Sequence, residues 1–573
     1  MIIKEFAGIR SFHDGLSVSD YTNMIPLEAS CIDRLGEHLV VERGSTNQKV
    51  LQTFIDSQKN VYVATDKSIM RLMYVGNNQW QVRPIEAAWG GSFNYIGVES
   101  RTIENVTFCE STTKPSQVFM CDGKYVYYWN TVALTTPEVT ESIRLEYPTQ
   151  DFYKRTKAFV ASVLPLGDFQ DFNRSAPWNV YDVRDSNAAT GYRYGWFPML
   201  YDGTWRPLTV NYVGTLWNCT SITWYENRLV VVTKDTNTVR LSKIRPDRWL
   251  IPAQGSSDQR WLPLQVFWND ANGTVSYNFM PHAYISTASS ALLQDAVAFA
   301  GQLYFLNDTS IEVWTNTYDE DAPIQQNTMS TIHFGGRSPC IVADRMYLIC
   351  KDNWHNDFIA TIAQGGQIQR LSNDEIEKRI AGKAAIIRPL AVRDNSFIVV
   401  YCGDGYNGID LTRGLSVTRD GKWWTYDNRY IKNHTFSVWS VITMNGEQFD
   451  VGNHGEFIQQ DRNNRKHVDG SPILRFIRGC FTQLPVRGIV REVNVTCDTG
   501  VSFDNNRGKL YARISFDRGL SFGPYLYRSL GQPGKNDRQI VWRNCGSGNS
   551  FLLEFGTSDN VRFQLYEIGL EIQ

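Results

Sequence analysis

Short runs in which apolar and polar residues alternate follow one another along almost the whole chain. Alternation with a period of two places every second side chain on the same face of a β-strand. The runs are also rich in Val, Ile, Tyr, Phe and Trp, which favour strands. Asp122-Gly123 lies between two such runs, and an Asp-Gly pair readily adopts the positive φ of a two-residue hairpin turn. The pattern predicts an all-β protein built largely from hairpins.

A short pattern recurs along the chain: a turn followed by a compact apolar run. We call this pattern the recurring phrase. Copies begin at Asn60, Gly123, Asn227, Gly301, Asp344, Asp394 and Asn445. From Gly301 onward the copies are 43 to 51 residues apart, which is the length of one four-stranded blade of a β-propeller. We therefore expect a β-propeller of six or seven blades. The alternative is a generic β-rich chain in which such short phrases recur.

Two segments interrupt this rhythm. Residues 133–215 contain many Pro and aromatic residues and no copy of the phrase. Because linkers between domains are rarely rich in aromatic residues, we expect an inserted lobe there. Residues 245–290 are expected to form a second, smaller insertion. The blades are then expected in residues 1–132, behind an N-terminal arm, and in residues 216–469.

The end of the chain has a different pattern. Seven strand-like runs follow one another in residues 470–573, which predicts a separate antiparallel β-sandwich of about 100 residues.

One helix signal stands out from the strands. Ser372 and Glu375 have the spacing of a capping box, and Ile376 and Ile380 form an apolar pair one helical turn apart. We expect a short helix that ends at Gly382.

Composition excludes several classes of protein. With 57 Lys and Arg against 59 Asp and Glu, the chain lacks the cationic excess of an ordinary nucleic-acid binder. Aromatic residues make up 13% of the chain, so it has enough apolar surface to fold. No apolar run approaches the roughly 18 residues of a membrane-spanning helix. The ten cysteines show no C-x-x-C spacing, which favours reduced, buried thiols in a chain made in a cytosol.

Motifs of common enzymes are missing from the sequence. It contains no phosphate-binding loop, no H-E-x-x-H and no G-x-S-x-G. The string Gly403–Gly408 matches G-x-G-x-x-G, but no helix pattern follows it, so we interpret it as a turn between strands. The eight histidines never lie three or four residues apart. No catalytic residue, metal ligand or cofactor site is predicted.

One phrase resembles a motif of sialidase propellers. Ser515, Asp517, Gly519 and Phe522 match the Asp-box pattern S-x-D-x-G-x-x-F. In such a box the Asp accepts hydrogen bonds within its own hairpin, the Gly adopts a positive φ and the aromatic residue packs under the turn. The motif therefore predicts a structural turn. A glycosidase would need two opposed carboxylates, and the sequence indicates no such pair. A carbohydrate-active, sialidase-like propeller or a glycan-binding propeller remains the alternative.

Four stretches resemble the tail hub, or nozzle, proteins of short-tailed bacteriophages, a family also called packaged-DNA stabilization proteins. The first three are Asp20–Pro26, Leu306–Trp314 with Phe334–Ser338, and Ile368–Glu377, in which Leu371 replaces the family's Ile. The fourth comprises Asp517-x-Gly519-x-x-Phe522, Ser529-Leu530-Gly531 and Trp542-Arg543. The resemblance covers the N-terminus and parts of residues 295–573, and residues 133–290 have no counterpart in it.

This resemblance implies a structural virion protein and no enzyme. Its subunits form a ring, usually a hexamer, below the portal and the head-to-tail adaptor, after assembly in the host cytoplasm. The ring continues and closes the DNA channel, retains the packaged DNA and supports tail fibres or spikes. Double-stranded DNA would pass without sequence recognition, and a net charge of −2 is compatible with a channel that does not hold phosphates. We expect residues 133–215 to shape the tip constriction or a subunit interface.

Overall fold

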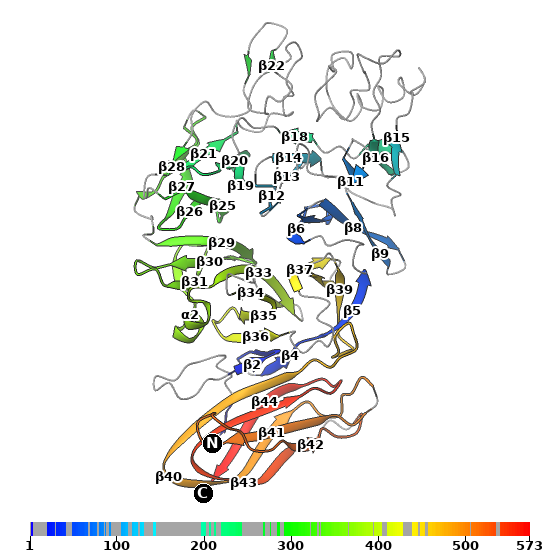
Figure 1. Cartoon of the computed structure of the whole chain (residues 1–573), viewed down its shortest axis with the longest axis vertical. Coiled ribbons are helices and arrows are strands. Elements are labelled where there is room, and N and C mark those ends of the chain that lie inside the picture. Colours follow the sequence, from blue (N-terminus) through cyan, green and yellow to red (C-terminus); the bar gives the residue numbers. More distant parts are fainter. Residues whose placement is uncertain are drawn as a thin grey trace. The chain divides into compact units, whose positions relative to one another are not determined.

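A computed structural model of the chain divides into two compact units (Figure 1). The middle unit comprises residues 43–337. The terminal unit comprises residues 1–42 and 338–573 and therefore contains both ends of the chain. The structure describes residues 2–3, 20–28, 30–41, 49–66, 69–76, 79–84, 86–87, 91–92, 103, 105–112, 117–123, 126–130, 141–144, 196–201, 205–207, 211–213, 219–242, 268–269, 275–276, 284–286, 291–320, 322–328, 332, 334–364, 366–392, 395–403, 410–427, 438–444, 447–452, 456–504, 506–534 and 539–573.

Strands dominate both units, so the prediction of an all-β protein is confirmed. Within the described residues, one helix, α2 (Asp374–Ile380), accompanies them. No helix in the described part of the chain is long and apolar enough to span a membrane. The nine cysteines whose side chains the structure describes form no disulfide bond, and seven of them are buried.

The middle unit contains four antiparallel sheets of four strands each. In chain order their strands are β6 (Val50–Ile55), β7 (Val61–Thr65), β8 (Ile69–Gly76) and β9 (Gln79–Pro84); β12 (Thr107–Glu110), β13 (Gln117–Cys121), β14 (Val126–Asn130) and β18 (Asn211–Val213); β19 (Cys219–Tyr225), β20 (Arg228–Thr233), β21 (Thr238–Leu241) and β24 (Tyr284–Ile285); and β25 (Leu293–Phe299), β26 (Gln302–Asn307), β27 (Ile311–Asn316) and β28 (Ile324–Gln326).

Consecutive sheets of the middle unit pack face to face. Along β20, Val231 belongs to a core that it shares with Phe119 of β13. The next residue, Val232, belongs to a core that it shares with Phe305 of β26. Because successive side chains of a strand point to opposite faces, β20 is covered on both sides, which explains its continuous apolar sequence.

Three more groups of four strands belong to the terminal unit, except for the first three residues of β29, which precede its boundary at Ser338. Their strands are β29 (Gly335–Val342), β30 (Arg345–Lys351), β31 (Asp357–Ala363) and β32 (Ile368–Arg370); β33 (Ala384–Val392), β34 (Asn395–Gly403), β35 (Asp410–Val417) and β36 (Trp423–Asp427); and β37 (Val438–Met444), β38 (Glu447–Gly452), β39 (Phe457–Asp461) and β5 (Gly36–Val41). The last group is completed by β5, which comes from the N-terminal segment.

Each copy of the recurring phrase falls on a different group of four strands. Six copies introduce the second strand of their group, and the copy at Gly123 introduces the third strand, β14. The predicted hairpin between β13 and β14 is present, and Gly123 has a φ of +80°. The predicted two-residue turn at Asp122-Gly123 is wrong, because four residues separate the paired Cys121 and Val126 and Asp122 does not have a positive φ. The phrase therefore marks a real structural repeat.

Both predicted insertions lie between the third and fourth strands of a sheet. β14 pairs directly with β18, and β21 pairs directly with β24, although long segments separate the partners in sequence. Most of residues 133–215 and 245–290 lies outside the described residues. The described short strands of these and neighbouring segments are β10 (Glu86–Ala87), β11 (Gly91–Ser92), β15 (Glu141–Arg144), β16 (Trp196–Tyr201), β17 (Trp205–Pro207), β22 (Trp268–Asn269) and β23 (Val275–Ser276).

Five strands follow the last group of four. They are β40 (Arg475–Cys497), β41 (Lys509–Ser515), β42 (Leu526–Ser529), β43 (Ile540–Thr557) and β44 (Gln564–Ile572). Seven runs were expected, and two pairs of runs are continuous because β40 and β43 are long strands that pair with each other through several register shifts. β41 pairs with β42 and with the C-terminal part of β43. β44 pairs with the C-terminal part of β40.

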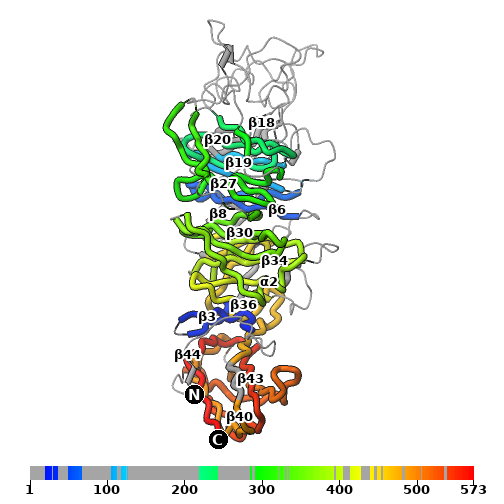
Figure 2. Tube along the Cα trace, turned by 90° about the vertical axis from the view of Figure 1, so that its left-hand side faces the viewer, coloured from blue at the N-terminus to red at the C-terminus, as the bar shows by residue number. Residues whose placement is uncertain are grey.

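The N-terminal strands join these C-terminal strands to a group of four. β2 (Asp20–Thr22) pairs in parallel with β36 and antiparallel with β40, so one hydrogen-bonded sheet runs from β33 to the C-terminal strands. Figures 1 and 2 show the blue N-terminal strands between β36 and the orange to red strands. The remaining N-terminal strands are β1 (Ile2–Ile3), β3 (Met24–Pro26) and β4 (Cys31–Asp33).

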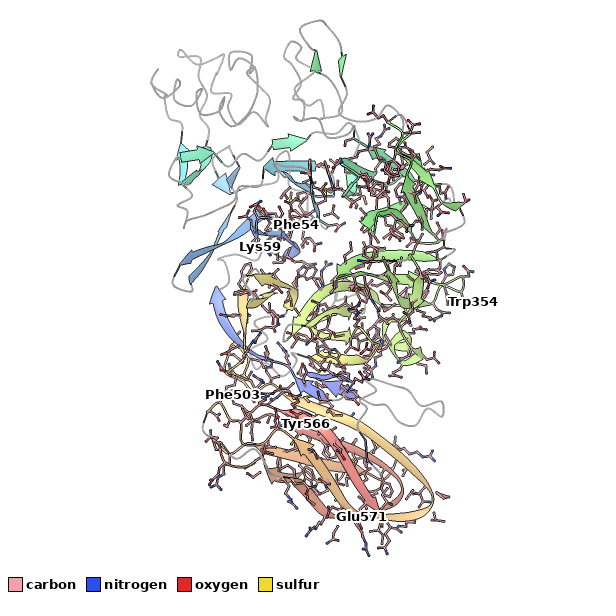
Figure 3. All side chains as sticks on the ribbon, turned by 180° about the vertical axis from the view of Figure 1, so that it is seen from behind. Phe54, Lys59, Trp354, Phe503, Tyr566 and Glu571 are labelled. Carbon is pink, nitrogen blue, oxygen red and sulfur yellow. The ribbon has the colours of Figure 1, made fainter. Side chains whose placement is uncertain are left out.

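A buried cluster of charges fixes the N-terminal segment in place. The Asp33 Oδ2 atom accepts hydrogen bonds from Arg465 Nε at 2.6 Å, from Arg475 Nη1 at 2.9 Å and from the Phe563 backbone N–H at 3.1 Å. Asp33 and Arg475 are fully buried. Burial lowers the pKa of Arg475 to about 10, and the charge of Asp33 opposes that shift. The Arg465 guanidinium also lies over the ring of Phe503, which Figure 3 labels.

The helix begins one residue later than the sequence predicts. Asn373, and not Ser372, is the N-cap, and its side-chain Oδ1 accepts the Ile376 N–H at 3.0 Å. The capping box of Ser372 and Glu375 is therefore not formed. The helix ends before Gly382, whose φ is +68°, as the sequence predicts.

Other partners explain why the capping box is absent. The Ser372 hydroxyl accepts the Ile359 N–H of β31 at 3.0 Å and donates to Glu377 Oε1 at 2.8 Å. Glu375 accepts a bond from Arg379 at 3.1 Å, one helical turn further along. The hydroxyl of Ser372 therefore links the helix to the preceding sheet.

The Asp33 cluster predicts a large effect of one substitution. Asp33→Asn removes the carboxylate that faces two buried guanidinium groups. We expect the free energy of unfolding of the terminal unit to fall by about 3–5 kcal/mol, because uncompensated buried charges are costly. Chemical denaturation followed by tryptophan fluorescence measures this change.

Asp344→Asn is the matched control. Asp344 pairs with Arg419 at 2.6 Å, but their side chains are 42% and 68% exposed. We expect this change to stay within about 0.5 kcal/mol. Equal effects of the two substitutions would contradict the role given to Asp33.

Candidate functional site

The predicted Asp-box turn lies directly after β41. The Ser515 hydroxyl donates to Asp517 Oδ1 at 2.6 Å and accepts the Gly519 N–H at 2.7 Å, while the Ser521 N–H donates to Asp517 Oδ1 at 2.9 Å. These bonds, led by the Ser515 hydroxyl, lower the pKa of Asp517 to about 2. Gly519 has a φ of +93°, which a residue with a side chain rarely adopts.

Phe522 has a role that the motif does not predict. The sequence predicts that its ring packs under its own turn. In the structure, the guanidinium carbons of Arg513 of β41 and Arg478 of β40 lie 4.6 and 5.0 Å from the centre of this ring. The turn therefore places an aromatic ring between two arginines from two other strands.

Further aromatic rings extend this stack on both sides. Arg478 also lies 5.5 Å from the ring of Phe476, and Arg513 lies 4.8 Å from the ring of Tyr525. Tyr525 in turn stacks on Tyr527, with ring centres 6.2 Å apart and an angle of 24° between their planes. We call this set of stacked side chains the arginine ladder. Its members in order are Phe476, Arg478, Phe522, Arg513, Tyr525 and Tyr527.

One buried carboxylate holds both arginines of the ladder. Glu554 of β43 is 1% exposed. Arg513 donates to both of its oxygens, at 2.6 and 2.9 Å. Arg478 donates to Oε2 through Nε at 2.9 Å and Nη2 at 2.6 Å. The strand register brings the three together, because Glu554 is the direct partner of Arg513 on one side and of Arg478 on the other.

A glycine two residues after Glu554 on β43 leaves room for a tyrosine. Gly556 pairs with Tyr511 on β41 and with Phe476 on β40. A Cβ atom at Gly556 would lie 2.5 Å from the Tyr511 hydroxyl and 2.7 Å from the Cβ atom of Phe476. Tyr511 can therefore lie across β43, where burial and the nearby Glu554 raise its pKa.

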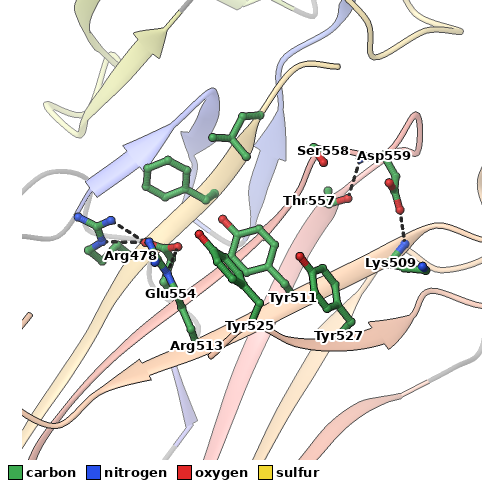
Figure 4. A pocket seen from close by; sticks show the side chains of 12 residues that line it. Arg478, Lys509, Tyr511, Arg513, Tyr525, Tyr527, Glu554, Thr557, Ser558 and Asp559 are labelled. Atoms are coloured by element: carbon green, nitrogen blue, oxygen red, sulfur yellow. Dashed lines mark hydrogen bonds and ion pairs between the residues drawn. The ribbon is translucent and has the colours of Figure 1, made fainter. Parts of the chain in front are cut away.

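These side chains line a groove of about 560 Å³ on one face of the strands, which we call the ladder groove (Figure 4). Alternation along β41 explains its composition: Lys509, Tyr511 and Arg513 face the groove, while Leu510 and Ala512 belong to the core. Lys509 and Asp559 lie at one end of the groove, and the arginines lie at the other (Figure 4). The lining residues are Leu474, Phe476, Arg478, Lys509, Tyr511, Arg513, Tyr525, Tyr527, Glu554, Thr557, Ser558 and Asp559.

The groove has the features of a binding surface. Glu554, its central carboxylate, already accepts four hydrogen bonds from two guanidinium groups, so it is poorly placed to act as a general acid or a nucleophile. The exposed aromatic rings and the donors of the arginines are available to a ligand. Within the described residues, no group of His, Cys, Asp and Glu could hold a metal ion.

Sequence reasoning found the turn but missed the groove. The motif search selected Ser515, Asp517, Gly519 and Phe522, and of these Phe522 reaches the ladder. Arg478 and Glu554 are 76 residues apart in sequence, so only the strand register brings them together. The one available signal was the alternation of polar and apolar residues along β41.

The other motif examined in the sequence is also accounted for. Gly403–Gly408 lies between β34 and β35, which are antiparallel neighbours. It therefore connects two strands, as interpreted from the sequence. Residues 404–409 lie outside the described residues.

Comparisons with known proteins add little to this description of the fold and the groove. Neither the known protein families nor the curated proteins include a match to the chain. Among solved structures, virginiamycin B lyase from Staphylococcus aureus is similar, with 8% identity and a TM-score of 0.34 over 73% of this chain and 97% of that chain. BamB from Moraxella catarrhalis is similar with 9% identity and a TM-score of 0.29 over 73% and 98%. Likenesses this weak carry no argument about what this chain does.

Glu554→Gln tests whether the carboxylate organises the groove. The substitution leaves Arg478 and Arg513 without their shared charge, and their side chains are 30% and 21% exposed. We expect a loss of about 2–3 kcal/mol in the free energy of unfolding, less than for fully buried pairs because water reaches both arginines. In the control Glu492→Gln, the partner Arg543 is 77% exposed, so the change should be below about 0.5 kcal/mol. Similar losses in both variants would refute the assignment.

Asp517→Asn tests the charge in the turn. The folded-state pKa of about 2 lies below the ordinary value of 3.8, so the ionised carboxylate stabilises the fold above about pH 4. That stabilisation is lost as the pH falls through about 2. We expect the variant to have a lower thermal unfolding midpoint than the wild type at pH 6, with a difference that shrinks between pH 4 and 2. A difference independent of pH would rule out the ionised Asp517 as its cause.

Proposed function

We propose that this chain is a structural subunit of the tail of a short-tailed bacteriophage, a tail hub or nozzle protein of the packaged-DNA stabilization family. One observation supports this best. Three of the four stretches that resemble the family occupy structural junctions of the terminal unit. Asp20–Pro26 forms β2 and β3 beside β36 and β40, Ile368–Glu377 forms the entry to α2, and Asp517–Phe522 forms the turn that supplies the ladder.

We further propose that the seven groups of four strands form one closed, seven-bladed propeller. β5 directly precedes β6, the first strand of the first sheet, and it is also the fourth strand of the last group. When the last group takes its fourth strand from the segment that precedes the first group, the two ends of the repeat are tied together, which is a means of closing a ring of blades. A closed ring also protects the strand edges, which suits a subunit that packs against copies of itself.

The position of the insertions supports a role at one end of such a subunit. Both insertions connect the third and fourth strands of their sheets, and the two sheets are consecutive. In a propeller, equivalent connections of neighbouring blades emerge on the same side. These two connections would then leave their blades on the same side of the subunit, which we assign to the end where a nozzle narrows the DNA channel.

The C-terminal strands would form the platform for fibres or spikes. β40 and β43 pair with each other along most of their length, and their further partners change along the way, as in strands that pass between the two layers of a sandwich. β2 and then β44 pair with β40, and β41 pairs only with the second half of β43. β2 links these strands through hydrogen bonds to β36. A load on the platform would thus be transmitted to a blade through a continuous sheet.

Assembly tests this proposal. We expect the purified full-length protein, mixed with portal and adaptor complexes, to form rings of defined stoichiometry, six copies being the expectation, in electron micrographs. The rings should add to the end of the adaptor, and DNA passing through them should show no sequence preference. A protein that stays monomeric and does not bind the adaptor would overturn the proposal.

A glycan-binding protein is the second candidate. The specific observation in its favour is the ladder groove, where Tyr525 and Tyr527 are 49% and 55% exposed beside two arginines. A protein of this kind would bind oligosaccharides without forming rings on the adaptor.

A further inference from the structure

The arginines of the ladder keep unused hydrogen-bond donors. A guanidinium group carries five N–H bonds, and each arginine donates to Glu554 only through Nε and Nη2. Within the described residues, the side chains of Arg478 and Arg513 make no other hydrogen bond. The Nη1 groups and the second Nη2 hydrogens are therefore available, and the side chains are 30% and 21% exposed.

The local charge favours an anion. The lining of the groove carries three cationic side chains, Arg478, Lys509 and Arg513, and two carboxylates, Glu554 and Asp559, which leaves one positive charge in excess over the groove as a whole. Asp20, the strand partner of Arg478 on β2, does not line the groove. The ladder also fixes the orientation of both guanidinium groups, because aromatic rings flank each of them. A planar, preorganised guanidinium binds carboxylates with less loss of side-chain entropy than a lysine does.

An aromatic platform lies next to these donors. Tyr525 and Tyr527 each expose about half of their surface, and Tyr511 packs edge-on against both rings and holds them from below. Tyr525 stacks on Arg513 with one face and on Tyr527 with the other, so these rings offer a sugar their exposed edges and their hydroxyls. The groove of about 560 Å³ lies within the size range of small-ligand sites.

An extended peptide fits this site less well than a sugar. β42 is an edge strand, to which a peptide could add as a further strand. However, successive carbonyls of a strand point to opposite edges, so only one of each neighbouring pair faces the free edge of β42. Both Leu526 O and Tyr527 O are occupied, by the Trp542 Nε1–H at 2.8 Å and by Arg528 at 3.0 Å, so one carbonyl of the free edge already has a partner. A peptide would therefore find an incomplete row of backbone partners.

We propose that the ladder groove binds a saccharide that carries a carboxylate, such as a sialic or uronic acid residue. The carboxylate contacts the free N–H groups of Arg478 and Arg513, and the neighbouring sugar ring packs against the exposed edges of Tyr525 and Tyr527. This site does not depend on the tail function, because a hub subunit and a free lectin could both use it.

The test is a titration of the full-length protein with 3′-sialyllactose, trigalacturonic acid and neutral lactose, followed by isothermal calorimetry and saturation-transfer NMR. We expect at least one acidic sugar to bind about tenfold or more tightly than lactose. Arg513→Lys keeps the charge but lacks the planar fork, and should weaken that binding about tenfold. Tyr525→Leu should weaken it through loss of the exposed ring edge and its hydroxyl.

Arg543→Lys is the matched control, since Arg543 is 77% exposed, pairs with Glu492 and lies outside the groove. It should leave the binding unchanged. Equal binding of acidic and neutral sugars, no binding of either acidic sugar up to about 10 mM, or an unchanged affinity of Arg513→Lys would each overturn the proposal. Tighter binding of a hexaglutamate peptide than of both acidic sugars would also overturn it and indicate a peptide-docking surface.

Discussion

A single buried carboxylate, that of Asp33, determines where the N-terminal segment lies. A charge in the protein interior is stable only with partners, and Asp33 finds them in Arg465 and Arg475. These contacts fix the end of β4, and the short chain before it then places β2 between β36 and β40. Without that strand, the sheet that joins a group of four to the C-terminal strands would be interrupted.

β40 carries charges to both of its faces. Arg475 points into the core toward Asp33, and Arg478 points to the outer face toward Glu554. Each site contains two arginines and one acid, but their surroundings differ. Around Asp33, backbone carbonyls such as Val561 O accept the remaining donors, so the cluster is closed and structural. Around Glu554, donors remain open to the groove, which makes a binding role possible.

The sequence predicted the repeat well because the repeat is local. Each recurring phrase is a turn and its following strand, and alternation over a few residues is enough to recognise it. The insertions were recognised for the same reason, since they interrupt a regular spacing. The helix cap was placed one residue early because Ser372 and Asn373 are both good caps, and only the contact of Ser372 with β31 decides between them. The ladder groove was missed because its members come from four strands, and register between distant strands is not written in local patterns.

Native-state hydrogen exchange, measured in increasing denaturant, tests most directly whether β2 unites the terminal unit. If it does, the amides of Tyr21 in β2, Thr425 in β36 and Ile477 in β40 should become exposed in one cooperative step with the same opening free energy. Exchange of the β40 amides at clearly lower denaturant than those of β36 would mean that the C-terminal strands open independently, and would contradict this account.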